Sequence, residues 1–225
     1  MEAYDAVAEL YSGVFDSIEL RQFEWPWLLK LIGEFKPRSI LDLGCGNGYL
    51  AKALFPLVPR LYAVEPCEPL FLSARERLGK DAVLFQAPAE NLPFNDREFD
   101  MVISLLSFRY MQWDKALGEI HRVLKPGGIF ILIDLFASRF DPLYLPNYIE
   151  TWTVTHLQHM KNRTYRKKLL LLSKNREWLK MTAEHPKREL SDAKACIREK
   201  FFIKKEKLLS AALGGKTVGL VCVKR

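Results

Sequence analysis

The alternation of short apolar runs with amphipathic segments between residues 38 and 134 constrains the fold most. The apolar runs are typical of buried strands and cover 38–43, 60–65, 82–86, 99–104 and 129–134. Segments starting near Gly48 and covering 68–79 and 114–124 have helical periodicity. Strands this uniformly apolar, separated by helices, predict a parallel sheet covered on both faces, with ligands at the carboxyl ends of its strands.

The length and composition fit one α/β domain, because 225 residues with 49% hydrophobic content suffice for one sizeable core. No apolar stretch approaches the roughly 18 residues that a membrane span needs, and the N-terminus resembles no signal peptide. The four cysteines form no close pair and no metal-ligand spacing, which disfavours a disulfide framework or a structural zinc. We therefore expect a cytoplasmic protein without a membrane span.

Helical segments are expected on both sides of this core. Residues 1–36 predict a helical cap, with Tyr4 and Tyr11 on one face of its first helix. After the fifth strand, prolines break the chain, and 137–190 predicts a helical insertion. Residues 191–225 predict a helix capped by Ser191 or Asp192, followed by an antiparallel strand pair. The core itself then spans 37–136.

Positive charge is concentrated near the insertion. The net charge is +7, and residues 161–207 hold sixteen Lys or Arg against six Asp or Glu. Such asymmetry can attract nucleic acid, a phosphorylated metabolite or a lipid surface, but it is equally typical of a solvated helical face.

The segment "ILDLGCGNGYLA", residues 40–51, places glycines at every second position directly after the first strand. Glycines here let the chain turn sharply and let a ligand touch backbone N–H groups near a helix N-terminus. The spacing G-x-G-x-G differs from the G-x-G-x-x-G of dinucleotide-binding proteins, and no G-K-[ST] follows. Dehydrogenase and P-loop functions are therefore disfavoured.

Two acidic residues narrow the choice of ligand. Asp42 precedes the glycines and would accept hydrogen bonds from a cationic ammonium group, whereas it would repel a pyrophosphate. Glu65 ends the second strand, where its two oxygens can accept hydrogen bonds from both ribose hydroxyls. An ammonium group at one end and adenosine at the other describe S-adenosylmethionine.

Four blocks in order, "ILDLGCGNGYLA", "LYAVEP", "APAENLPFNDREFDMVIS" and "EIHRVLKPGGIFILID", resemble the class I S-adenosylmethionine-dependent methyltransferases. The resemblance covers roughly residues 36–136. It implies a seven-stranded, Rossmann-like, doubly wound sheet whose last strand is antiparallel. The helical insertion then follows the fifth strand.

The resemblance also implies roles for individual residues. The cofactor-binding set comprises Asp42 near the ammonium, Gly44, Cys45, Gly46 and Gly48 in the loop beneath the methionine part, Glu65 on the ribose, Pro66 beside the adenine, Ala89 and Glu90 at the adenine edge, and Ser104 at the end of the fourth strand. The family often has an acidic residue where this chain has Pro88. Adenine selectivity would then depend on Ala89, Glu90 or solvent.

Methyl transfer from a sulfonium is an in-line displacement that depends mainly on alignment and desolvation, so a catalytic base is optional. We assign no catalytic residue and no metal, because His156 and His159 lack a third ligand. The segment "SLLSFRY" lacks the Asn/Asp-Pro-Pro-aromatic sequence typical of methyltransferases that act on nucleobase or amide nitrogen.

The substrate-side candidates are Tyr11, Phe108, Arg109, Tyr110, Tyr148 and Trp152. Arg109 can bind a substrate carboxylate or phosphate, or pair with Glu19 or Asp114. Tyr148 and Trp152 recur at a helical spacing that suits either a pocket lining or ordinary core.

Three functions remain. In the favoured one, the insertion roofs a pocket for a small-molecule methyl acceptor that is acidic or partly apolar. One alternative is an RNA methyltransferase whose basic insertion binds phosphates along the RNA backbone. The other is a cofactor-binding module without turnover. The sequence identifies neither the acceptor nor the oligomeric state.

Overall fold

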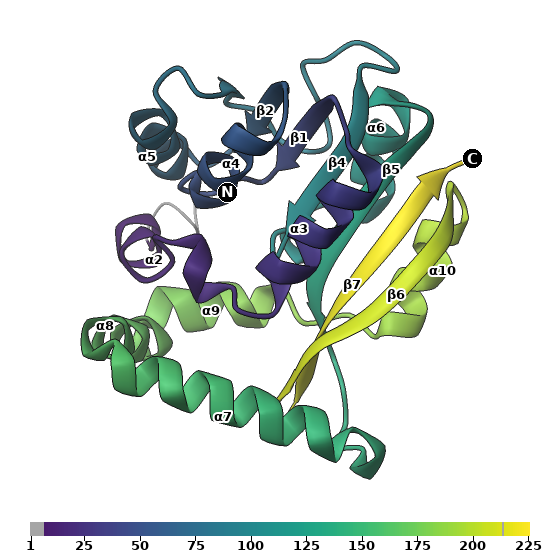
Figure 1. Cartoon of the computed structure of the whole chain (residues 1–225). Coiled ribbons are helices and arrows are strands. Elements are labelled where there is room, and N and C mark those ends of the chain that lie inside the picture. The colour runs from purple at the N-terminus through teal and green to yellow at the C-terminus, as the bar shows by residue number, and fades with distance from the viewer. Residues whose placement is uncertain (1–6, 213) are drawn as a thin grey trace.

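Seven strands form one mixed sheet in the order β3-β2-β1-β4-β5-β7-β6 (Figure 1). The protein is described by a computed structural model that covers residues 7–212 and 214–225. The strands are β1 (Ser39–Leu43), β2 (Arg60–Val64), β3 (Val83–Phe85), β4 (Phe99–Leu105), β5 (Leu124–Phe136), β6 (Phe201–Ala212) and β7 (Gly215–Lys224). Strands β1 to β5 pair in parallel, and β7 pairs antiparallel with both β5 and β6. The predicted seven-stranded class is confirmed.

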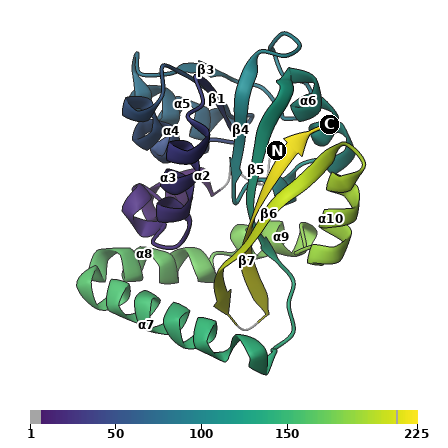
Figure 2. The ribbon, with the colours of Figure 1, turned by 45° about the vertical axis from the view of Figure 1, so that its right-hand side comes forward.

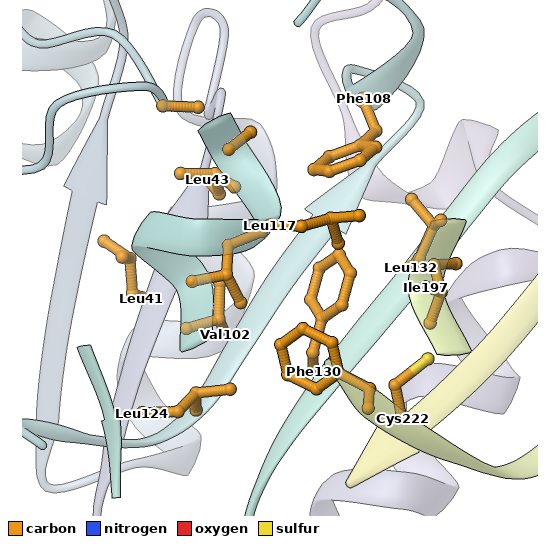
Figure 3. Packing of buried hydrophobic residues seen from close by; sticks show 14 of the residues in the cluster. Leu41, Leu43, Val102, Phe108, Leu117, Leu124, Phe130, Leu132, Ile197 and Cys222 are labelled. Atoms are coloured by element: carbon orange, nitrogen blue, oxygen red, sulfur yellow. The ribbon is translucent and has the colours of Figure 1, made fainter. Parts of the chain in front are cut away.

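Helices cover both faces of this sheet (Figure 2). One face packs against α3 (Glu24–Phe35), α4 (Tyr49–Leu54) and α5 (Glu68–Leu78), and the other packs against α6 (Trp113–Val123) and α10 (Leu190–Arg198). Successive strand residues point to opposite faces of the sheet. Ile40 therefore joins a first hydrophobic cluster, under α3, α4 and α5, and Leu41 joins a second cluster, under α6 and α10. Figure 3 shows the second cluster, in which Leu117 and Ile197 pack over Phe130 and Leu132 of β5.

The insertion leaves the sheet at the carboxyl end of β5 and returns to the same place. It contains α7 (Leu145–Lys161), α8 (Arg163–Lys174) and α9 (Arg176–Glu184). Ala137 and Glu189 form a parallel bridge, and the Ala137 N–H donates to the Arg188 carbonyl at 2.8 Å. The three helices are therefore tethered at both ends beside the carboxyl ends of the parallel strands.

Shorter elements complete the chain. Helix α2 (Ala8–Val14) precedes the core, and four single-turn 3₁₀ helices are η1 (Ile18–Leu20), η2 (Phe55–Leu57), η3 (Phe108–Tyr110) and η4 (Pro142–Tyr144). Tyr4, predicted to share a face with Tyr11, lies outside the described residues. Among the described residues, none of the helices has the length and apolar character needed to cross a bilayer.

The predicted cap of the last helix is wrong. Helix α10 begins at Leu190, one residue earlier than expected, and Glu189 occupies its N-cap without a side-chain cap bond. The bridge at Glu189 sets this start, so Ser191 and Asp192 lie in the first turn and hydrogen-bond to each other at 3.1 Å.

Candidate functional site

A cavity of about 610 Å³ lies at the carboxyl ends of β1, β2 and β4, as predicted for a parallel sheet. Its lining comes from the loops after these strands, from α2 and from the end of α9. The lining residues include Tyr11, Asp42, Gly44, Cys45, Gly46, Tyr49, Glu65, Pro66, Pro88, Ala89, Glu90, Ser107, Tyr110, Met111, Gln112, Met181 and His185. The cavity is of ordinary size for a small-molecule site.

Backbone hydrogen bonds hold the glycine loop against the next strand. The Val64 carbonyl accepts hydrogen bonds from the backbone N–H groups of both Gly44 and Cys45, each at 3.0 Å. The Gly46 N–H donates to Glu65 Oε2 at 2.8 Å, and the Cys67 N–H donates to Glu65 Oε1 at 3.0 Å. Glu65 thus joins the two loops and is itself oriented by them.

The three glycines serve different purposes, although all have positive φ. A Cβ at Gly44 would lie 2.8 Å from Ser107 Oγ, so this glycine permits loop packing. A Cβ at Gly46 would meet only Tyr11 Cε1, at 3.8 Å, and would project into the cavity space. A Cβ at Gly48 would lie 3.2 Å from Ala74 of α5. The interpretation of Gly48 as a ligand contact is therefore corrected, since it allows close helix packing and does not line the cavity.

The two acids are buried in the cavity wall. Burial, with a further contribution from Glu65, raises the pKa of Asp42 to about 8. Burial likewise raises the pKa of Glu65 to about 7, opposed by the N–H groups of Cys67 and Gly46. Asp42 Oδ2 is buried and finds no hydrogen-bond partner among the described residues. A cation that enters the cavity would stabilise the buried carboxylate of Asp42 and would give its Oδ2 a hydrogen-bond partner.

The loop after β3 also reaches the cavity. Pro88, Ala89 and Glu90 line it beside Pro66 of the loop after β2, and Glu90 Oε1 accepts a hydrogen bond from the Gln112 N–H at 2.6 Å. That contact ties the loop to the start of α6 and fixes one oxygen of the Glu90 carboxylate.

Ser104 is not in the lining, contrary to expectation. It is buried in the sheet, and its Oγ lies 2.9 Å from Ser107 Oγ. Ser107 takes the expected position, lines the cavity and donates to the Leu43 carbonyl at 3.0 Å. At this edge the cavity is lined by the last residue of β4, Leu105, and by Leu106 and Ser107 of the following loop, whereas Ser104 is fully buried.

Two residues of η3, Phe108 and Arg109, were assigned to the substrate side, and the structure corrects both. Phe108 is fully buried, points toward Phe130 and packs edge-on against Trp113 at 4.7 Å (Figure 3). The Arg109 guanidinium donates to the carbonyls of Thr182, at 3.2 Å, and His185. Arg109 therefore fastens the end of α9 to η3, and neither Glu19 nor Asp114 is its partner among the described contacts.

Tyr11, Tyr110, Met181 and His185 form the opposite wall of the cavity, which we call the acceptor side. The rings of Tyr110 and His185 lie 5.3 Å apart, and His185 Nδ1 lies 3.1 Å from the Met181 carbonyl. Tyr11 packs against Trp178 of α9 at 6.0 Å, and burial raises the pKa of its hydroxyl. The expected roof is thus supplied by α9 and α2.

Tyr148 and Trp152 lie elsewhere. They line a second cavity of about 480 Å³ between α7 and the β6–β7 hairpin, together with His156 and His159. Their assignment to the substrate side of the first cavity is wrong, because α7 runs along the hairpin while α9 turns back toward the cavity.

Sequence reasoning missed Met181 and His185 because the insertion's helical period does not indicate which of its three helices returns to the sheet. It also missed Tyr49, Met111 and Gln112, which line the cavity. The only available signal was position, since each of these three lies in or just after a loop at a strand's carboxyl end.

Comparisons with known proteins agree with this geometry. A family model for the methyltransferase domain matches residues 41–132. A demethylmenaquinone methyltransferase from Thermotoga maritima is 30% identical over 161 residues, which cover 68% of this chain and 69% of the relative. A malonyl-[acyl-carrier protein] O-methyltransferase from Buchnera aphidicola is 36% identical over 105 residues, or 46% of this chain and 42% of the relative.

A solved structure shares the fold. It is an S-adenosylmethionine-dependent methyltransferase from Aquifex aeolicus, with a TM-score of 0.60 and 16% identity over 87% of this chain and 88% of that one. Together these matches show that the chain is an enzyme of the class I S-adenosylmethionine-dependent methyltransferase family, with S-adenosylmethionine as its cofactor.

Proposed function

We propose that this enzyme transfers the methyl group to a small-molecule acceptor bound between the glycine loop and the acceptor side. One observation carries this proposal: a single cavity of about 610 Å³ is lined by Asp42, Gly46 and Glu65 and also by Tyr110 and His185. A cofactor on the loop would leave its reactive end facing a wall built by α2, η3 and α9.

The residues present fit S-adenosylmethionine. The unpartnered Oδ2 of Asp42 suits a cationic ammonium group, and each oxygen of Glu65 keeps acceptor capacity for a ribose hydroxyl after its one backbone hydrogen bond. Gly46 leaves space where a side chain would project. Pro66, Ala89 and Glu90 would then flank the adenine.

When bound, the cofactor supplies an electrophilic methyl group on a sulfonium. The chain's own contribution is to exclude water and to align an acceptor, which is worth up to about 7–11 kcal/mol in favourable cases. His185 is the one imidazole among the described lining residues, and its Nδ1 contact with the Met181 carbonyl favours Nε2 as the free acceptor nitrogen. We place His185 against the acceptor, where an oxygen or carbon nucleophile would lose its proton.

Two observations favour a small molecule over RNA. Tyr165 and Trp178 are the aromatic residues within 161–180, and both pack internally, on His159 at 5.7 Å and on Tyr11 at 6.0 Å. They are therefore occupied rather than presented for base stacking. The names of both curated relatives also specify acceptors other than nucleic acid.

The test is incubation with methyl-labelled S-adenosylmethionine and a cell extract separated into metabolites, RNA and protein. We expect label in the metabolite fraction, and none with a Gly46→Val control. Label confined to RNA or protein would contradict the proposal. Cofactor binding without label in any fraction would favour a binding module instead.

A further inference from the structure

Helices α7 and α8 present an apolar and strongly basic surface away from the catalytic cavity. Among the described residues, seven of the sixteen exposed large hydrophobic side chains lie on α7 and α8. Both figures of the whole chain place α7 and α8 at the same end of the molecule (Figures 1 and 2). This concentration exceeds the scattered apolar exposure of ordinary surfaces.

On α7 the exposed apolar residues form a stripe. Leu145, Ile149, Trp152 and Met160, with the imidazole of His156 between the last two, follow one another at steps of three or four residues, which places them on one helix face. All five are exposed, and Trp152 retains 67% of its surface. Trp152 and His156 also border the second cavity, and α7 contacts the hairpin through Thr151, whose Oγ1 accepts a hydrogen bond from the Ala211 N–H at 3.0 Å.

On α8 the exposed face combines leucines with cations. Leu172 is buried, whereas Leu170 and Leu171 are half exposed between Lys167 and Lys174. Residues 161–180 contain eight Lys or Arg and a single acidic residue, Glu177, for a formal net charge of +7. This is as large as the net charge of the whole chain.

We propose that this surface of α7 and α8 docks on an anionic lipid bilayer. An apolar stripe with a tryptophan, flanked by lysines and arginines, suits the boundary between acyl chains and anionic headgroups. The charge argues against a second copy of the chain, because a symmetric contact would place one basic patch against another. The exposed leucines argue against RNA, whose backbone gains little from apolar side chains.

The test is sedimentation of the full chain with vesicles of phosphatidylcholine alone or with about one-third phosphatidylglycerol. We expect much tighter binding to the anionic vesicles, weakened at about 1 M salt, where the Debye length is about 3 Å. Each Lys or Arg near such a surface contributes about fivefold to affinity, so Lys167→Glu with Lys174→Glu should lose roughly 25-fold or more.

The matched control is Lys30→Glu with Lys80→Glu, which changes the net charge equally at exposed positions elsewhere and should keep most of the binding. For the apolar part, Trp152→Ala should weaken vesicle binding, whereas Leu57→Ser, at an exposed leucine outside the surface, should not. Unchanged cofactor affinity and circular dichroism would show that the variants fold.

Equal binding to both vesicle types, absence of vesicle binding, or equal losses in test and control pairs would overturn the proposal. A dimer in light scattering that Trp152→Ala converts to a monomer, without vesicle binding, would identify a second copy as the occupant. An RNA complex abolished by the Lys167/Lys174 reversal, again without vesicle binding, would identify RNA.

Discussion

The two walls of the cavity are built by different means. On the strand side, backbone N–H groups donate to the Val64 carbonyl and to both oxygens of Glu65, so the main chain itself shapes the wall. On the acceptor side, the ring contacts of Tyr11 with Trp178 and of Tyr110 with His185, together with the guanidinium of Arg109, hold α9 in place.

This difference between the two walls follows the extent of the family model. The family model ends at residue 132, before the insertion that contributes Met181 and His185. A wall made from backbone geometry suits a cofactor that is always the same. A wall made from side chains on an added helix suits an acceptor that differs between enzymes.

The largest expected effect is on the strand side. Gly46→Val should weaken S-adenosylmethionine binding by about 100-fold or more, because the side chain would fill ligand space and strain a backbone at φ +58°. Calorimetric titration measures this. As the matched control, Gly48→Val should mainly lower the melting temperature by clashing with Ala74; the reverse pattern would assign the ligand contact to Gly48.

Glu65→Ala should weaken cofactor binding by roughly 10- to 100-fold, because it removes charge-assisted acceptors and leaves the Gly46 and Cys67 N–H groups unpaired. Glu65→Gln, which keeps one acceptor oxygen, should lie between this variant and the wild type. Affinity unchanged in Glu65→Ala would remove the ribose assignment.

Cofactor affinity should rise with pH. In the free protein burial raises the pKa of Asp42 to about 8, whereas a bound ammonium group favours the carboxylate and lowers that pKa. Binding below about pH 8 therefore releases a proton, and affinity should increase about tenfold per pH unit in that range. Calorimetry in buffers of different ionisation enthalpy detects the proton. Asp42→Asn should bind weakly with a flatter pH profile, and an unaltered slope would exclude Asp42 as the titrating group.

The smallest effect on the cofactor should come from the acceptor side. Arg109→Met removes the guanidinium from the carbonyls of Thr182 and His185, so hydrogen exchange at the end of α9 should accelerate by roughly 5- to 30-fold. Cofactor affinity should change by less than about twofold. Arg139→Met, at an exposed arginine, should leave exchange unchanged; equal acceleration in both variants would show that Arg109 does not hold the helix.

The sequence predicted the sheet and the strand side well, because local signals determine both. Apolar runs locate the strands, and Asp42, near the end of β1, and Gly46 and Glu65, just after β1 and β2, reach the cavity edge. Ser104 was misplaced by three residues, since a loop's path around a buried side chain such as Phe108 is a packing outcome without a sequence period.

The acceptor side could not be predicted in the same way. Helical periodicity predicts a helical insertion over 137–190 but not which helix returns to the sheet, because the bridge at Ala137 and Glu189 and the Arg109 contacts are long-range. The spacing of Tyr148 and Trp152 suits a pocket, a core or an exposed face equally, and the structure places Trp152 largely in solvent.

The central claim is that the strand side binds the cofactor while the acceptor side aligns the acceptor. The most direct test measures cofactor affinity and label transfer to the metabolite fraction for His185→Ala beside Glu65→Ala. We expect His185→Ala to bind S-adenosylmethionine within about twofold of the wild type while transfer at saturating cofactor falls at least about tenfold. If His185→Ala loses cofactor affinity as far as Glu65→Ala, or transfers methyl groups at the wild-type rate, this division of the cavity is wrong.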